Sequence, residues 1–206
     1  MTDARDIARN VLDEHGMTYC EELGIRIASN TPSALFKTLV FALLASARIS
    51  HSSALRATRA LFDAGWTTAR RMYETSWQER VTVLNRNGYA RYDESTSRYL
   101  GYDCELIMDK YGGDLRRLRE TAGRDVEEER RLLIEFKGIG EVGVSIFFRE
   151  AQVAWQELYP FADKFAIEQA KKMNLGTSAR DLARLVEPDE FPRLVAGIVR
   201  TRFDKK

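Results

Sequence analysis

The stretch from Leu132 to Phe148 constrains the fold most, because two apolar helical segments meet there across a turn that contains two glycines. The turn is Lys137-Gly138-Ile139-Gly140, and apolar residues repeat at helical spacing on both sides of it. Glycine permits a positive φ angle and a close approach of the backbone to a ligand, and Ile139 is expected to pack between the helices. The free amides that open the second helix form a positive dipole end that suits a phosphate. An ordinary tight helical hairpin is the alternative interpretation, since Gly-x-Gly alone is common.

Helical periodicity extends over almost the whole chain, and no run of alternating β-branched residues predicts a strand. We therefore predict an all-α fold. Thr31 and Pro32 supply an N-cap and a first-turn proline for a mostly buried helix, which we place at the centre of the core. One short helix is expected to lead to Tyr73, and a second is expected to run through Leu84. The other predicted helices cover residues 55–62, 93–111, 115–121, 127–136, 141–159, 165–173, 179–186 and 191–203, with a turn at 85–88.

Composition narrows the class of protein. A chain of 206 residues, 44% apolar and 31% charged, can bury a core as one domain or as two small lobes. The net charge of +1 argues against a generally polycationic protein but leaves room for a local basic face. Residues 164–206 hold ten Lys/Arg against six Asp/Glu, so a basic surface would draw on this part of the chain, although charge runs are usually solvated helix faces.

Metal centres, membrane spans and secretion find no support in the sequence. The cysteines Cys20 and Cys104 lack the paired spacing of a zinc or iron–sulfur site, and buried thiols are the simpler interpretation. The two histidines are too few and too far apart for a metal centre. The longest apolar run, residues 39–45, is too short to cross a bilayer, and the first residues lack a signal pattern. We therefore place the protein in the cytoplasm, without a membrane partner.

Three further segments extend the pattern of the glycine turn. They are the apolar helix of residues 39–48, the Asn-Gly-Tyr turn of residues 87–89, and Pro160-Phe161-Ala162-Asp163. With the turn, they resemble the helix-hairpin-helix superfamily of base-excision DNA glycosylases, and within it the endonuclease III branch, over about residues 30–175. The resemblance implies a helical lobe of residues 31–150, with the hairpin at about 128–150, and a second lobe of residues 1–30 plus 151–206. DNA would lie in the cleft between the lobes.

By this resemblance Asp163 is the catalytic carboxylate. Cleavage of a base–sugar bond builds positive charge on the sugar, and a fixed anion beside it lowers the barrier while it orients water. Without the resemblance, an aspartate here would be read as the N-cap of the helix that starts at Lys164. The turn is expected to grip the DNA backbone without reading sequence, with room for a monovalent cation. The backbone contacts that we expect are Lys137, Gly138, Ile139, Gly140, Glu141, Val142 and Lys164.

The sequence departs from the family at several positions. Bifunctional members carry a lysine that forms a Schiff base where this chain has Val142, so the usual lyase activity is not expected. No cysteine occurs in residues 174–206, so we expect no iron–sulfur cluster and no other cofactor. Arg48 stands where the branch tends to place a gap-filling glutamine, and Tyr89 falls at the wedge position. Both suit base flipping, with His51 facing the same cleft, although a surface arginine and a half-buried tyrosine are equally good interpretations.

These features predict a monomeric, monofunctional DNA glycosylase that hydrolyses the N-glycosidic bond of a damaged or mismatched base in double-stranded DNA. A non-enzymatic protein of the same fold that binds damaged DNA is the main alternative. A third interpretation keeps lyase activity with Lys164 as a relocated amine. A helical scaffold unrelated to nucleic acid is the fourth, and it predicts no salt-dependent binding to DNA.

Overall fold

The computed structural model describes residues 3–203, and every regular element in that range is helical, so the prediction of an all-α fold is confirmed. The chain forms two compact units. The internal unit is Ile25–Phe147, and the terminal unit combines the residues up to Gly24 with those from Phe148 onward. The terminal unit is therefore assembled from both ends of the chain.

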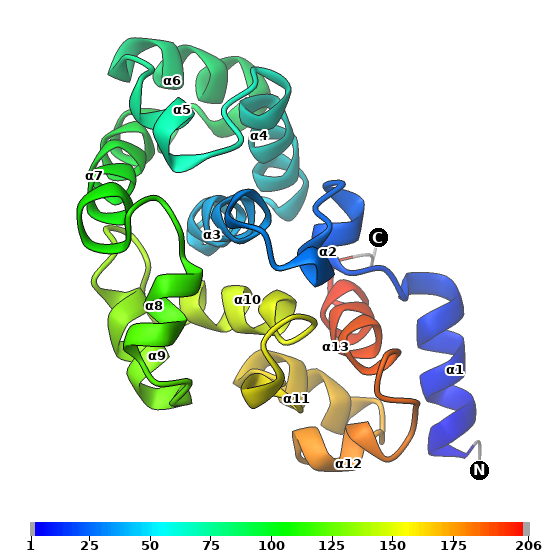
Figure 1. Ribbon diagram of the computed structural model, residues 1–206. Coiled ribbons are helices and arrows are strands. Elements are labelled where there is room, and N and C mark those ends of the chain that lie inside the picture. The colour runs from blue at the N-terminus through cyan, green and yellow to red at the C-terminus, as the bar shows by residue number, and fades with distance from the viewer. Residues whose placement is uncertain (1–2, 204–206) are drawn as a thin grey trace. The chain divides into compact units, whose positions relative to one another are not determined.

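The internal unit is built around one buried helix, α3 (Pro32–Ser46), as expected from its composition. Thr31 caps α3 by accepting a hydrogen bond from the Ala34 amide, and Pro32 opens its first turn. Ten of its residues are buried, and α4 to α9 curve around it in Figure 1. The remaining elements of this unit are η1 (Ile27–Ser29), α4 (His51–Asp63), α5 (Ala69–Tyr73), α6 (Trp77–Leu84), η2 (Asn85–Tyr89), α7 (Asp93–Tyr111), α8 (Arg116–Thr121) and α9 (Val126–Ile134).

The boundaries of these helices follow local sequence signals. Ser76 starts α6 with a reciprocal capping box to Glu79. The helix α7 has the predicted bounds and ends where Gly112 adopts a left-handed conformation. The expected turn at 85–88 is present as a kink at Gly88, whose φ angle is +81°. The helix α4 begins four residues before its predicted start because Ser50 caps it.

The terminal unit packs α1 (Ala4–His15) against α13 (Phe191–Arg200). Gly197 permits this contact, because a Cβ atom there would lie 2.8 Å from a methyl carbon of Val11. On its other side α13 packs against α11 (Lys164–Lys172), which Figure 1 shows beside it. The other elements of this unit are α2 (Tyr19–Glu22), η3 (Gln156–Leu158) and α12 (Ala179–Ala183).

The predicted helix of residues 141–159 is wrong in its second half. The helix α10 (Glu141–Ala151) ends at Ala151, whose carbonyl accepts hydrogen bonds from the amides of Ala154 and Trp155 in a tight turn. This turn buries Trp155 completely and leads into η3. The side chain of Gln152 then bonds both the amide and the carbonyl of Phe161, which fixes the loop before Asp163.

Both cysteine thiols are buried, as expected, and burial raises the pKa of Cys104 to about 12. Among residues 3–203, no helix has the length and the apolar character needed to cross a lipid bilayer.

Candidate functional site

The turn between α9 and α10 depends on Gly138. Its φ angle of +79° is one that residues with a side chain rarely adopt. A Cβ atom at this position would also lie 2.7 Å from a methyl carbon of Leu43 and 2.8 Å from the ring of Tyr99. Ile139 is buried and packs against Gly143, where a Cβ would approach it to 3.2 Å. The glycine turn is therefore held tightly against α3 and α7.

Gly140 differs from Gly138 because its surroundings are open. A Cβ atom at Gly140 would meet nothing within 4 Å, and the residue is exposed. Its carbonyl accepts the first hydrogen bond of α10, from the amide of Val144, so Gly140 occupies the N-cap position. Within the described residues, the amides of residues 140–143 have no hydrogen-bond acceptor. Unpaired amides at an open helix start suit an anion.

Charges around the turn are mixed. Glu141 is exposed at the first position of α10, and its carboxylate is held by Arg130 at 2.8 Å. Lys137 is exposed in the turn itself. Val142 is 61% exposed and faces solvent.

Asp103 of α7 holds the glycine turn in place through a hydrogen bond to its backbone. Its Oδ1 atom accepts a hydrogen bond of 2.7 Å from the Lys137 amide, and its side chain is buried on the same helix face as Leu100 and Ile107. Burial raises the pKa of Asp103 from 3.8 to about 8, partly offset by this hydrogen bond and by the Lys137 charge. Asp103 therefore holds a proton in the folded protein at pH values where it is ionised in the unfolded chain.

This raised pKa predicts a pH-dependent stability. A carboxyl whose pKa is higher in the folded state contributes most below its unfolded pKa, and the contribution is lost as pH rises toward about 8. We expect the free energy of unfolding to fall by up to ~1.4 kcal/mol per pH unit over this range, relative to an Asp103→Asn variant that cannot titrate. Urea unfolding of both proteins from pH 5 to pH 8.5 checks this, and a difference that stays constant with pH would contradict it.

Asp163 is the N-cap of α11, as its position before Lys164 suggested. Its Oδ1 atom accepts a hydrogen bond of 3.0 Å from the Ala166 amide. Its Oδ2 atom pairs with the Arg149 guanidinium at 2.9 Å, and the residue is only 9% exposed. The guanidinium and the helix N-terminus both contact this side chain and hold it in place. Lys164 beside it is exposed.

Neighbouring side chains of the terminal unit pack around Arg149. Its guanidinium carbon lies 5.5 Å from the centre of the Tyr19 ring, and that of Arg200 lies 4.2 Å from it. The neighbouring Glu150 is buried, and its carboxylate accepts the Tyr19 and Cys20 amides at the start of α2. Burial raises the pKa of Glu150. Arg149 is thus packed rigidly while it contacts Asp163.

The residues predicted to enter the duplex have different environments. Arg48 is exposed after the end of α3, whereas Tyr89 is fully buried and its hydroxyl donates to the Leu44 carbonyl at 2.8 Å. The Tyr92 hydroxyl donates to the Arg48 carbonyl at 3.4 Å, so two tyrosines join the η2 segment to the end of α3. His51 opens α4, with its ring edge-on to Phe41. Tyr89 therefore anchors the loop from inside the core, and in this conformation its side chain is not available at the surface as a wedge.

Comparison with family models, curated proteins and solved structures gave no match.

Sequence reasoning missed two of the residues that organise these sites. Asp103 lies on the apolar face of α7, and a carboxylate in that position signals a buried hydrogen bond. Arg149 follows two phenylalanines in the run Ile146-Phe147-Phe148, where a charged residue signals a buried partner. Neither signal identifies the partner. Lys137, the partner of Asp103, is distant in sequence, and Asp163, the partner of Arg149, follows a loop.

Proposed function

We propose that the protein binds double-stranded DNA through a helix-hairpin-helix formed by α9, the glycine turn and α10, and excises a damaged or mismatched base as a monofunctional glycosylase. The observation that supports this most is the open start of α10, where the amides of residues 140–143 have no internal acceptor. A phosphate oxygen would accept hydrogen bonds from them, and Lys137 would add a positive charge. Such contacts are indifferent to base sequence, as a scanning repair enzyme requires.

In this proposal Asp163 supplies the fixed negative charge of the reaction. The bond from the sugar C1′ to the base breaks with its electron pair passing to the base, and water adds to C1′. Asp163 opposes the positive charge that develops on the sugar and passes the proton of the water on to the departing base. Arg149 and the start of α11 hold the Asp163 side chain in a fixed orientation. Lys137, Lys164 and the exposed Arg48 would contact the DNA.

One observation favours the non-enzymatic alternative. Both oxygens of Asp163 already have partners, and the side chain is nearly buried, as in a purely structural ion pair. The purified protein and its Asp163→Asn variant, assayed on duplexes with oxidised, alkylated, deaminated and mismatched bases, distinguish the two functions. A glycosylase gives strand breaks only after alkali, and the variant gives none. Tight binding without product from any duplex would leave the non-enzymatic function.

Val142→Lys offers a gain-of-function prediction. The position is 61% exposed, so a lysine fits without disturbing the core. The variant is expected to form a Schiff base with abasic DNA, which borohydride reduces to a covalent adduct, whereas the wild-type protein forms none. Val142→Arg is the control, since it adds the same charge without a nucleophilic amine. Trapping of the wild-type protein would instead point to Lys164, and a Lys164→Arg variant would then lose the adduct.

A further inference from the structure

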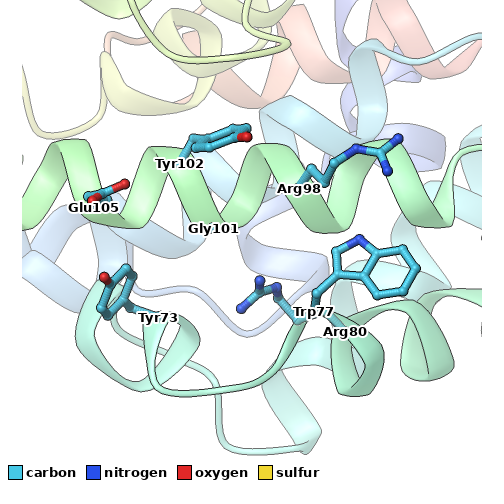
Figure 2. A pocket seen from close by; sticks show the side chains of 7 residues that line it. All are labelled: Tyr73, Trp77, Arg80, Arg98, Gly101, Tyr102 and Glu105. Carbon is cyan, nitrogen blue, oxygen red and sulfur yellow. The ribbon is translucent and has the colours of Figure 1, made fainter.

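A groove on the internal unit lies away from the glycine turn in sequence and combines aromatic and cationic side chains. Its volume is about 430 Å³, within the range of small-ligand sites. Figure 2 shows α7 along one side and the shorter α5 and α6 along the other. The residues that line it are Tyr73, Trp77, Arg80, Arg98, Gly101, Tyr102 and Glu105.

Arg80 is the unusual residue of this groove, because it is a charge that is only 6% exposed. Its Nε and Nη1 atoms donate to carbonyls of Ser97, Met72 and Thr75, so uncharged groups hold the guanidinium in place. Within the described residues no carboxylate pairs with it, and its Nη2 atom has no acceptor. Burial lowers the pKa of Arg80. A buried cation that no carboxylate contacts favours an anionic ligand.

Gly101 leaves this guanidinium accessible from the groove. A Cβ atom at Gly101 would lie 3.1 Å from the Nη2 atom of Arg80. Any side chain at this position would therefore cover the unpaired donor. Glycine costs roughly 1 kcal/mol inside a helix relative to alanine. In return for this cost, Gly101 leaves the guanidinium of Arg80 accessible from the groove.

Aromatic rings form the walls. Tyr73 and Tyr102 are 51% and 55% exposed, and Trp77 is 37% exposed, which is high for such large apolar surfaces. The indole of Trp77 is fixed by a hydrogen bond of 3.2 Å from its Nε1 atom to the Glu94 carbonyl. Exposed aromatic rings, one of them held in place, suit the stacking of a flat ligand.

The two ends of the groove carry opposite charges, both from residues of α7. Arg98 and Glu105 are separated by seven residues, or about 10 Å of helix, with Gly101 between them. Figure 2 shows Arg98 toward the Trp77 end and Glu105 toward the Tyr73 end. Arg98 lies 4.0 Å from the exposed Glu94 carboxylate, a weak surface pair that an anionic ligand can displace. One end of the groove therefore offers a cationic side chain, and the other offers a hydrogen-bond acceptor.

We propose that this groove binds a nucleotide, with the phosphate at Arg80 and Arg98 and an amino-bearing base between the aromatic rings. The exocyclic amino group of the base would donate to Glu105. The nucleotide is either free or part of a DNA strand, and both present the same chemistry to the groove. The proposal is independent of the glycine turn and of Asp163, so it stands or falls separately from the glycosylase function.

Calorimetric titration of the full-length protein with 5′-dAMP tests this, with deoxyadenosine, inorganic phosphate and 5′-dTMP as comparisons. We expect 5′-dAMP to bind at least tenfold more tightly than the nucleoside or phosphate, and severalfold more tightly than 5′-dTMP, which lacks the amino group. Tryptophan fluorescence should be quenched in parallel, and a Trp77→Phe variant should lose the quenching. A short oligo(dA) that binds much more tightly than 5′-dAMP identifies a DNA strand as the source, and equal affinities identify the free nucleotide.

Gly101→Leu is the decisive variant, because it fills the groove while it favours the helix. It should weaken 5′-dAMP binding at least tenfold in protein that circular dichroism shows to be folded, and Arg98→Gln, which leaves Gly101 intact, should weaken binding severalfold. Arg5→Gln, which removes an exposed arginine of α1, should change nothing. No heat and no quenching at millimolar 5′-dAMP, or equal binding by the Gly101→Leu variant, would overturn the proposal.

Discussion

The Gly140→Asp variant is expected to lose at least about tenfold in affinity for duplex DNA of any sequence while its stability is unchanged or slightly higher. The space around Gly140 is open, so the side chain fits. Aspartate is a preferred N-cap residue, and its carboxylate would accept a hydrogen bond from the first amides of α10. The same carboxylate would occupy and repel the phosphate. Stability and binding should therefore change independently.

Filter binding at several salt concentrations, together with urea unfolding, measures both quantities. Gly140→Ala is the matched control, because it adds a side chain without charge and should bind within about threefold of wild type. Gly138→Ala should behave in the opposite way. Its φ angle of +79° and its contacts with Leu43 and Tyr99 predict a loss of roughly 1–3 kcal/mol in the free energy of unfolding. Wild-type affinity in Gly140→Asp would remove α10 from the DNA interface.

The second large effect concerns the buried pair of Arg149 and Asp163. Asp163→Asn is expected to reduce base excision by at least about 10²-fold. It should also lower the free energy of unfolding by about 3 kcal/mol, because Arg149 would keep a buried charge without a partner. Asparagine can still cap α11, so the helix start itself should be preserved.

A double-mutant cycle separates these effects. Adding Arg149→Met to Asp163→Asn removes the stranded charge and should restore most of the stability but none of the excision. The excision assays are run at a temperature at which circular dichroism shows every variant to be folded. If the double variant excises like wild type, another group performs the reaction. If the double variant is as unstable as Asp163→Asn alone, the unpaired charge of Arg149 is not the cause of the lost stability.

How much the sequence predicts depends on whether the signal is local. The N-cap at Thr31 and the bounds of α7 are encoded within a few residues, and these predictions are confirmed. The end of α10 at Ala151 was missed, because no glycine or proline marks it and the break depends on burying Trp155. Local rules cannot anticipate a helix end that tertiary packing sets.

The candidate sites show the same division. The conformation of Gly138 and the capping role of Asp163 could be predicted because glycine and capping residues have local geometric roles. The partners Asp103 and Arg149 were missed, since pairing in space is invisible in one sequence. Tyr89 shows a third case, in which the sequence left a wedge and a half-buried tyrosine equally open, and the side chain is fully buried because a carbonyl of α3 satisfies its hydroxyl.

The discontinuous terminal unit has a consequence for how the protein is made. The helix α1 packs on α13, and Arg9 pairs with Glu190, 181 residues further along the chain. During synthesis, at roughly 5–20 residues per second, α1 therefore waits for seconds to tens of seconds before its partner leaves the ribosome. Its apolar face, which includes Val11, stays uncovered in the meantime. The internal unit is complete earlier in translation, so α1 is the helix most exposed to aggregation and proteolysis while the chain is being made.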